Sequence, residues 1–220
     1  MSGSTPGPRV TVVAFDVDGT LTTRDCVVPF MWSITGPARL LGRLTRRAHH
    51  LVAPSIRRQR DRLKALGTEA AFAGLDAAEL RERGGRFAER VAAERLRPDT
   101  NARLQWHREA GHRIVLVSAS YEIYLWRLAE LLGADAALGT RLEVVEGHCT
   151  GALDGPNCRG PEKVRRVHEW LADHHGGRRA VELWAYGDSI GDRELIADAD
   201  RGVWVEGVLT RAPGPDRGGW

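Results

Sequence analysis

Two aspartates separated by one residue, Asp16 and Asp18, follow directly on an apolar, β-branched segment over Arg9–Phe15. Such a run is typical of a strand buried on both faces. Side chains two residues apart in an extended chain point the same way, so both carboxylates can face one point. One can attack an electrophile while the other handles the proton of the leaving group. Gly19 then permits a tight turn and Thr20 offers a hydroxyl and a backbone donor to an anion, although the motif alone also fits an ordinary acidic turn.

A second set of hydrogen-bond donors follows another apolar segment, Arg113–Val117. Ser118 comes directly after it, and its hydroxyl can bond a phosphoryl oxygen together with adjoining backbone N–H groups such as that of Ala119. For Ser118 in isolation, a role in starting a helix is favoured over a role in binding phosphate. Ser120, two residues later, stands before a helical pattern that starts at Tyr121 and fits the role of a helix N-cap.

A lysine and a second pair of aspartates complete the set. Lys163 lies near the start of a predicted helix, where the helix dipole disfavours a cation, so a nearby anion would explain its position; an ordinary surface lysine is the alternative. Lysine is also rare, since the chain holds only Lys64 and Lys163 among its 32 basic residues. Asp188 and Asp192 follow a third apolar segment, and with Asp16 they would repel one another unless a hard cation such as Mg²⁺ lay between them. An N-capping role for Asp192 stays open.

Alternating strands and helices must position these residues. Strands are predicted over 9–15, 113–117, 181–186 and 203–205, helices over 98–110, 121–132 and 162–175, and strands or a hairpin over 140–153. This order predicts an α/β fold, with a parallel sheet covered by helices on both faces. The mostly helical stretch 26–97, with breaks near 36–37, 54 and 84–85, is too long for a simple crossover. We expect it to form a cap over the carboxyl end of the sheet, where ligands bind in open α/β folds.

The composition bounds the class of protein. The chain has 220 residues, 42% of them apolar and 28% charged, which fits one soluble domain or a core with a smaller insert. The net charge of +3 does not by itself imply nucleic acid, and no nucleic-acid partner is expected. Three cysteines without C-x-x-C spacing predict reduced thiols, with a bond between Cys149 and Cys158 as the minor alternative. The first eight residues do not resemble a signal peptide and no run reaches the roughly 18 apolar residues of a membrane span, so a cytoplasmic location is expected.

The order and spacing of these motifs resemble the haloacid dehalogenase superfamily over roughly residues 9–206. Phe15–Leu21 is similar to its motif I, Ser118 to motif II, Lys163 to motif III and Gly187–Asp192 to motif IV. The helical insert resembles the C1 cap of the phosphoserine phosphatase-like branch, as do residues 140–144, 150–151 and 160–163. The resemblance implies a Rossmann-like core at 9–24 and 98–208 and a cap at 25–97. The Gly/Pro-rich ends predict a disordered N-terminus at 1–8 and a flexible tail at 209–220.

The resemblance also implies that the protein is a Mg²⁺-dependent phosphatase that acts on small phosphorylated metabolites, and it implies roles for the site residues. Asp16 attacks phosphorus to form an aspartyl-phosphate, and Asp18 serves as general acid and then general base. The metal is held by the carboxylates of Asp16 and Asp188 and by the backbone carbonyl of Asp18, with support from Asp192 directly or through water. Phosphoryl oxygens are bound by a further set of groups: Thr20, Ser118, Ala119 and Lys163.

The substrate stays open. In phosphoserine phosphatases a glutamate at the cap entry binds the substrate amine, and the shorter Asp25 at that position puts phosphoserine in doubt. Asp25 also fits a solvated turn residue. The cap carries a basic run with apolar residues between: Arg39, Arg43, Arg46, Arg47, Arg57, Arg58, Arg60, Arg62 and Lys64, with Phe30, Met31, Trp32, Ile34, Leu40, Leu41, Leu44 and Leu51. A basic amphipathic helix can lie on an anionic membrane, and the same branch contains lipid-phosphate phosphatases. The basic run therefore fits either a surface that binds a lipid substrate or an ordinary solvated face of the cap.

Other classes fit less well. A phosphotransferase would keep all four motifs and use an acceptor other than water. A signalling receiver domain would lack the acid at Asp18 and the large insert, and an inactive scaffold usually loses the nucleophile, whereas Asp16 is present. The oligomeric state is not indicated by any sequence feature.

Overall fold

A five-stranded parallel sheet forms the centre of the computed structural model, which describes residues 9–45 and 56–209. The strand order is β3-β2-β1-β6-β7. The strands are bounded as follows: β1 (Val10–Phe15), β2 (Arg113–Tyr121), β3 (Ala136–Thr140), β6 (Val181–Gly187) and β7 (Arg201–Trp204). Every neighbouring pair is parallel, with Val12 opposite Arg113 and Val10 opposite Val181. The carboxyl ends of β1, β2 and β6 therefore meet at one edge.

Helices cover both faces of this sheet, as the sequence predicts. Side chains of β1 alternate between the two faces, which explains its unbroken apolar run. Val13 and Phe15 join a core with α5 (Pro98–Glu109) and α6 (Glu122–Leu132). Val12 and Ala14 join a second core with two further helices, α7 (Pro161–His175) and α8 (Arg193–Asp198). The predicted α/β class is confirmed.

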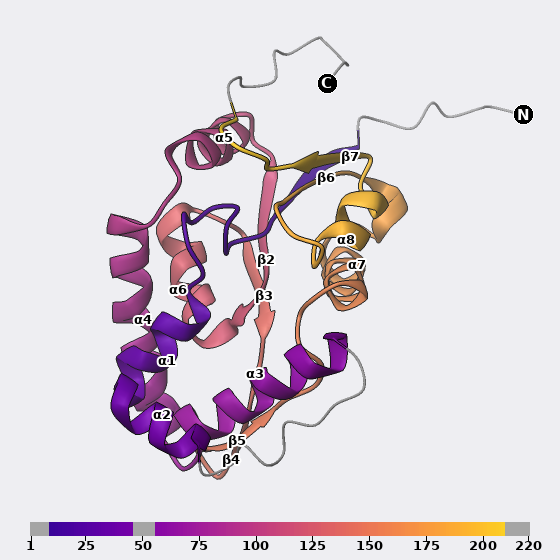
Figure 1. Ribbon diagram of the computed structural model, residues 1–220. Coiled ribbons are helices and arrows are strands. Elements are labelled where there is room, and N and C mark those ends of the chain that lie inside the picture. Colours follow the sequence, from indigo (N-terminus) through magenta and orange to yellow (C-terminus); the bar gives the residue numbers. More distant parts are fainter. Residues whose placement is uncertain (1–8, 46–55, 210–220) are drawn as a thin grey trace, which may run out of the picture.

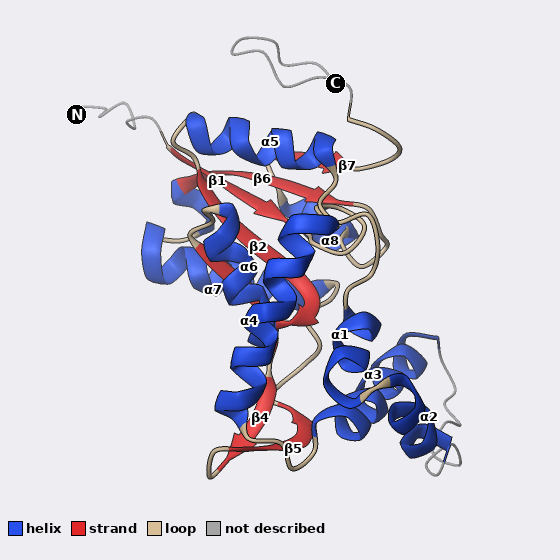
Figure 2. Ribbon diagram, turned by 90° about the vertical axis from the view of Figure 1, so that its left-hand side faces the viewer, coloured by secondary structure: helices blue, strands red, loops and turns tan. Residues whose placement is uncertain are grey.

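The insert between β1 and β2 is helical: α1 (Val27–Thr35), α2 (Pro37–Thr45), α3 (Ile56–Phe72) and α4 (Ala77–Glu94). In Figures 1 and 2 these helices extend away from the carboxyl edge, with α4 alongside α6 and a small antiparallel hairpin, β4 (Leu142–Val145) and β5 (His148–Leu153), beside α3. The predicted break at Gly36–Pro37 is confirmed. The one at Pro54, together with residues 1–8 and the tail from 210, lies outside the described residues.

Two expectations about local structure are wrong, and one edge strand is missing from the predicted set. Gly84 and Gly85 do not break α4, because Gly84 is buried where a Cβ would come within 2.7 Å of the Ile123 carbonyl oxygen, so the glycine lets α4 and α6 pack closely. Ser120 does not cap α6, since it belongs to β2 and its hydroxyl bonds elsewhere. The edge strand β3 was not predicted, because its small residues lack a β-branched run.

Two further observations concern the whole described chain. Cys26, Cys149 and Cys158 are free thiols, and all three are buried. Within residues 9–45 and 56–209, no helix is both long enough and apolar enough to cross a bilayer.

Candidate active site

The predicted site residues lie at the carboxyl edge of the sheet. Asp16 directly follows β1, and its N–H donates to the Tyr186 carbonyl (2.9 Å), which continues the β1–β6 ladder to the end of both strands. Ser118 lies in the last part of β2, and Asp188 directly follows β6. Neighbouring parallel strands thus bring residues far apart in sequence to one place.

Lys163 joins two aspartates at this edge. Its ammonium nitrogen lies 2.5 Å from Asp16 Oδ1 and also bonds Asp192 Oδ1. All three side chains are buried, with Lys163 only 2% exposed. Buried charges persist when they are paired, and the two carboxylates raise the pKa of Lys163 against the effect of its burial. Burial raises the pKa of Asp16, and the Lys163 ammonium opposes that rise.

Three carboxylates form a set that suits a cation. Oxygens of Asp16, Asp188 and Asp192 all lie within 4.8 Å of one another. Burial and the Asp192 charge raise the pKa of Asp188, so a positive ion there would relieve both desolvation and repulsion. An all-oxygen set of carboxylates matches what Mg²⁺ takes. The donor chemistry therefore fits that ion.

Glycine and threonine residues of the first loop shape the position of Asp188. Gly19 has φ 87°, and a Cβ there would lie 2.1 Å from Asp188 Oδ2, so both the backbone and the space require glycine. The buried Thr20 hydroxyl donates to Asp188 Oδ1 (3.2 Å). In this arrangement the Thr20 side chain orients the Asp188 carboxylate.

Asp192 is engaged on both oxygens. Oδ1 accepts from Lys163, and Oδ2 accepts from the Ser189 N–H (3.0 Å) and the Ser189 hydroxyl (2.8 Å). Its carboxylate precedes α8, but no side-chain capping bond is made to that helix. Of the three carboxylates, Asp192 is thus the one most occupied by protein donors.

Asp18 is held from two sides. Its Oδ1 accepts from the Cys26 N–H (2.9 Å) and its Oδ2 from the Ser120 hydroxyl, which in turn accepts from the Tyr124 hydroxyl. Burial raises the pKa of Asp18 to about 6, while the bond from Ser120 lowers it. A carboxyl group tuned to this range can both give and take a proton near neutral pH.

The Ser118–Ala119 segment is ordered by its own backbone and by distant side chains. Ser118 is 1% exposed, and its Oγ accepts from the Ser120 N–H (3.1 Å), so its hydroxyl proton is left to donate. The Ala119 carbonyl accepts from the Thr140 hydroxyl (2.8 Å) and from the Lys64 ammonium.

Sequence reasoning missed Lys64 and misassigned Ser120. The sequence pattern places Lys64 in the basic run of the cap, yet its side chain reaches the end of β2 from α3. A signal was present: both lysines of the chain, Lys64 and Lys163, contact this edge. The contact of Ser120 with Asp18 had no comparable signal.

Burial and, to a smaller extent, the Asp25 charge raise the pKa of Asp18, so Asp25 lies within electrostatic reach of that carboxyl group. Asp25 is exposed, and its Oδ1 accepts from the N–H groups of Val27 (2.8 Å) and Val28 (3.3 Å), as in the turn interpretation. Trp32 and Leu41 are 50% and 64% exposed. Residues of the basic and apolar runs that lie outside the described residues are Arg46, Arg47 and Leu51.

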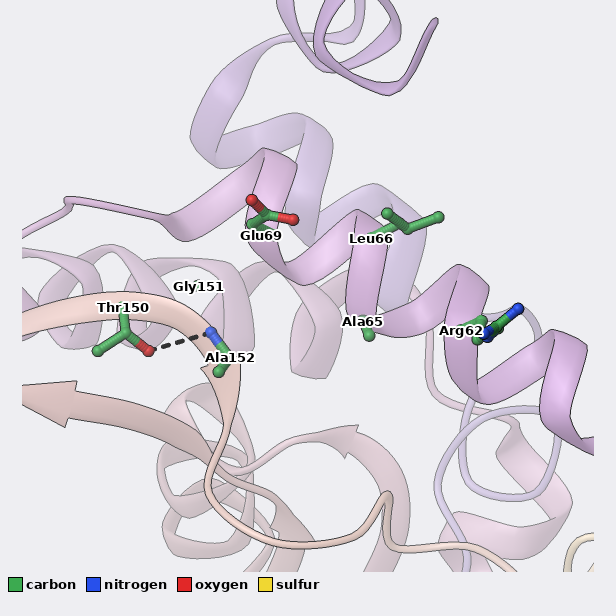
Figure 3. Close-up of a pocket in the computed structure, with 7 residues that line it drawn as sticks. All are labelled: Arg62, Ala65, Leu66, Glu69, Thr150, Gly151 and Ala152. Atoms are coloured by element: carbon green, nitrogen blue, oxygen red, sulfur yellow. Dashed lines mark hydrogen bonds between the residues drawn. The ribbon is translucent and has the colours of Figure 1, made fainter. Parts of the chain in front are cut away.

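A separate open cavity of about 440 Å³ lies between α3 and β5 (Figure 3). It is lined by two charged side chains and by small or apolar residues: Arg62, Ala65, Leu66, Glu69, Thr150, Gly151 and Ala152. None of the predicted site residues lines it.

Comparisons with known proteins agree on one family. The family model described as haloacid dehalogenase-like hydrolase matches residues 13–197. The chain is 38% identical over 195 residues to protein CicA of Caulobacter vibrioides, covering 88% of this chain and 85% of CicA. It is 29% identical over 168 residues to a phosphoserine phosphatase of Streptococcus thermophilus, covering 66% of this chain and 77% of that protein. A solved structure of a phospho-aspartyl intermediate analogue of phosphoserine phosphatase shares the fold, with a TM-score of 0.55 and 18% identity over 87% of this chain and 84% of that one.

Proposed function

The chain belongs to the haloacid dehalogenase-like hydrolases and is a phosphatase of the phosphoserine phosphatase-like kind, and we propose that it hydrolyses a small phosphomonoester through a phosphorylated Asp16. One observation carries this proposal. A buried lysine, Lys163, bridges Asp16 and Asp192 at the carboxyl edge, with Asp188 beside them. A carboxylate nucleophile, a fixed cation and an oxygen-ligand set are the parts that phosphoryl transfer to an aspartate needs.

Asp16 performs the attack in this proposal. Its Oδ1 is bonded to Lys163, so the other oxygen attacks phosphorus in line with the leaving oxygen. The P–O bond to the leaving group breaks as the Oδ2–P bond forms. Lys163 and the Ser118 hydroxyl, with backbone N–H groups such as that of Ala119, offset charge on the phosphoryl oxygens, where preorganised donors give most of the rate.

Asp18 handles the protons. Its protonated form gives a proton to the departing oxygen, and the resulting carboxylate takes one from the water that attacks the aspartyl-phosphate. The hydrolysis step restores Asp16 and releases inorganic phosphate. The pKa of about 6 suits a group that has to serve in both forms.

A divalent cation fits the carboxylate set, with Asp16 and Asp188 as its carboxylate ligands and the Asp18 backbone carbonyl as a further oxygen. When bound, Mg²⁺ supplies positive charge to the phosphoryl oxygens. Asp192 would support it directly or through water, and both of its oxygens already accept hydrogen bonds from Lys163 and Ser189. Thr20 orients Asp188 for the same purpose.

Replacing the nucleophile tests the proposal. We expect Asp16→Asn to lower kcat by at least about 10⁴-fold, because the amide oxygen is a poor nucleophile and the loss of a covalent nucleophile has effects of this size. Phosphate release from p-nitrophenyl phosphate is measured with Mg²⁺ and again with excess chelator, which should abolish the wild-type rate. A variant with near-normal turnover contradicts the role of Asp16. Release with and without added alcohols separates hydrolysis from transfer to another acceptor.

A lipid phosphate is a second candidate substrate, favoured by one observation. Trp32 on α1 and Leu41 on α2 are exposed, and so is Arg39 on α2. Apolar and basic side chains together can bind an anionic bilayer surface. Co-sedimentation with phosphatidylglycerol vesicles that weakens with salt supports this candidate, and no binding at low salt excludes it.

A further inference from the structure

The Lys64 ammonium joins α3 to three separate segments of the core. It donates to the Ala119 carbonyl in β2, to Thr140 Oγ1 at the end of β3 (3.0 Å) and to Asn157 Oδ1 in the loop before α7 (2.8 Å). An ammonium group has three donors, so these contacts use all of them. The nitrogen also lies 4.9 Å from the centre of the Tyr121 ring, which adds a cation–π contact.

The acceptors are themselves held in place. Asn157 Nδ2 donates to Asp61 on α3 (3.1 Å), which fixes the amide so that its oxygen faces Lys64. The Thr140 hydroxyl accepts from the Cys158 N–H (3.2 Å) and donates to the Ala119 carbonyl (2.8 Å). A network in which each member is satisfied specifies one arrangement more strongly than its separate bonds do.

This network acts on a peptide unit next to the phosphoryl-binding hydroxyl. The Ala119 carbonyl and the Ser120 N–H belong to the same planar peptide group. Lys64 and Thr140 hold its carbonyl end, and its N–H end donates to Ser118 Oγ (3.1 Å). Fixing one end of a rigid plane therefore fixes the direction of the donor at the other end.

We propose that Lys64 is a positioning residue of the active site, which through the Ala119–Ser120 peptide group holds the Ser118 hydroxyl toward the transferred phosphoryl group. The proposal rests on the proposed function, since it takes Ser118 as a phosphoryl ligand. It also makes the site depend on α3, because without that helix the Ala119 carbonyl keeps only Thr140 as its side-chain donor among the described contacts. Lys64 touches neither the substrate nor the metal ligands in this role.

The test compares Lys64→Met with Arg62→Met, an exposed cation two residues earlier on the same helix. Steady-state kinetics with p-nitrophenyl phosphate and inhibition by inorganic phosphate are measured for both. We expect Lys64→Met to raise KM and the inhibition constant of phosphate about 10-fold, the effect of losing one charge-assisted hydrogen bond, with the control within about twofold of wild type. Unchanged phosphate inhibition in Lys64→Met overturns the proposal.

A second arm separates positioning from general loss of structure. If Lys64 acts through Ser118, then Lys64→Met should add less than about twofold in the Ser118→Ala background, because effects of residues that act on one contact are not additive. Full additivity overturns the proposal. If Lys64→Met does not fold, Thr140→Val, which removes the other donor to the same carbonyl, is substituted in the same cycle.

A third arm does not depend on turnover. Hydrogen exchange of the Ser120 amide should become faster in Lys64→Met and stay at the wild-type rate in Arg62→Met, because the bond from this amide to Ser118 is the one that Lys64 stabilises. Equal protection in all three proteins overturns the positioning role. A wild-type protein without Mg²⁺-dependent phosphatase activity contradicts the proposed function alone, and the exchange result then decides whether Lys64 holds the peptide.

Discussion

Two lysine ammonium groups meet the same edge of the sheet in opposite surroundings. Lys163 contacts two buried carboxylates, which raise its pKa above the usual value. Lys64 donates to a carbonyl, a hydroxyl and an amide oxygen, and its burial lowers its pKa to about 8. The Lys163 ammonium is held by ion pairs at the carboxylate cluster. The Lys64 ammonium is held by hydrogen bonds to neutral acceptors where α3 meets the core. This difference indicates that the groups bonded to a buried lysine ammonium, rather than how deeply it is buried, decide what that ammonium contributes.

Of the two lysines, the charge-paired one should have the larger effect when it is removed. Lys163→Met leaves Asp16 and Asp192 buried without their shared cation, which costs about 3–5 kcal/mol of unfolding free energy for a broken buried pair. It also removes a fixed charge from the phosphoryl oxygens, for which we expect kcat to fall about 10²–10³-fold. Urea unfolding and p-nitrophenyl phosphate turnover measure the two effects. A variant with wild-type stability would show that the two carboxylates are neutral in the folded protein. The contrast between Lys163 with charged partners and Lys64 with neutral partners would then fail.

Alkaline pH should remove the charge of Lys64 but not that of Lys163 in the wild-type protein. Burial lowers the pKa of Lys64 to about 8, partly offset by Asp18, Cys158, Asp25 and Asp61, whereas Lys163 stays charged. Above about pH 8, Lys64 loses a proton and the donors to its three acceptors become fewer, so KM should rise several-fold between pH 8 and 9.5. The same series in Lys64→Met should be flat over this range. A rise of equal size in that variant assigns the effect to another group.

The free energy of unfolding should become more favourable to the folded protein over the same pH range in which KM becomes less favourable to the substrate. The folded pKa of Lys64 lies below its unfolded value of 10.5, so the unfolded chain binds more protons between about pH 8 and 10.5. The Lys64 contribution to the free energy of unfolding therefore increases as pH rises through this window. The difference between wild type and Lys64→Met in urea unfolding at pH 8 and 10 isolates that contribution.

The smallest effect is expected for the stability of Lys64→Met at pH 7. The substitution removes hydrogen bonds to three neutral acceptors but also removes a desolvated ammonium group, and the Thr140 hydroxyl still donates to the Ala119 carbonyl. These opposing terms should leave the free energy of unfolding within about 1 kcal/mol of wild type. Urea unfolding beside Lys163→Met checks this, and a loss as large as that of Lys163→Met would erase the distinction between the two sites.

The sequence predicts the carboxylate cluster better than the contacts of Lys64 for a physical reason. Asp16 and Asp188 each follow an apolar strand and Ser118 lies in the last part of another, and parallel strands bring their ends together whatever the helices do. The contacts of Lys64 depend instead on how α3 packs against distant segments, which no local pattern records. The same holds for Gly84, where the pattern indicates a break and the packing against Ile123 makes glycine part of a continuous helix.

The position of β1 between β2 and β6 has a consequence for how the chain is made. Val10 pairs with Val181, and Asp188 and Asp192 come later still. At about 5–20 residues per second, roughly 9 to 34 s separate the synthesis of these two paired valines. During that time the apolar β1 leaves the ribosome without one of its two neighbours, and an unpaired strand edge of this kind is prone to aggregation. A nascent chain of this protein therefore lacks the second neighbour of β1 and two carboxylates of the cluster, and needs protection, until Val181 to Asp192 have been translated.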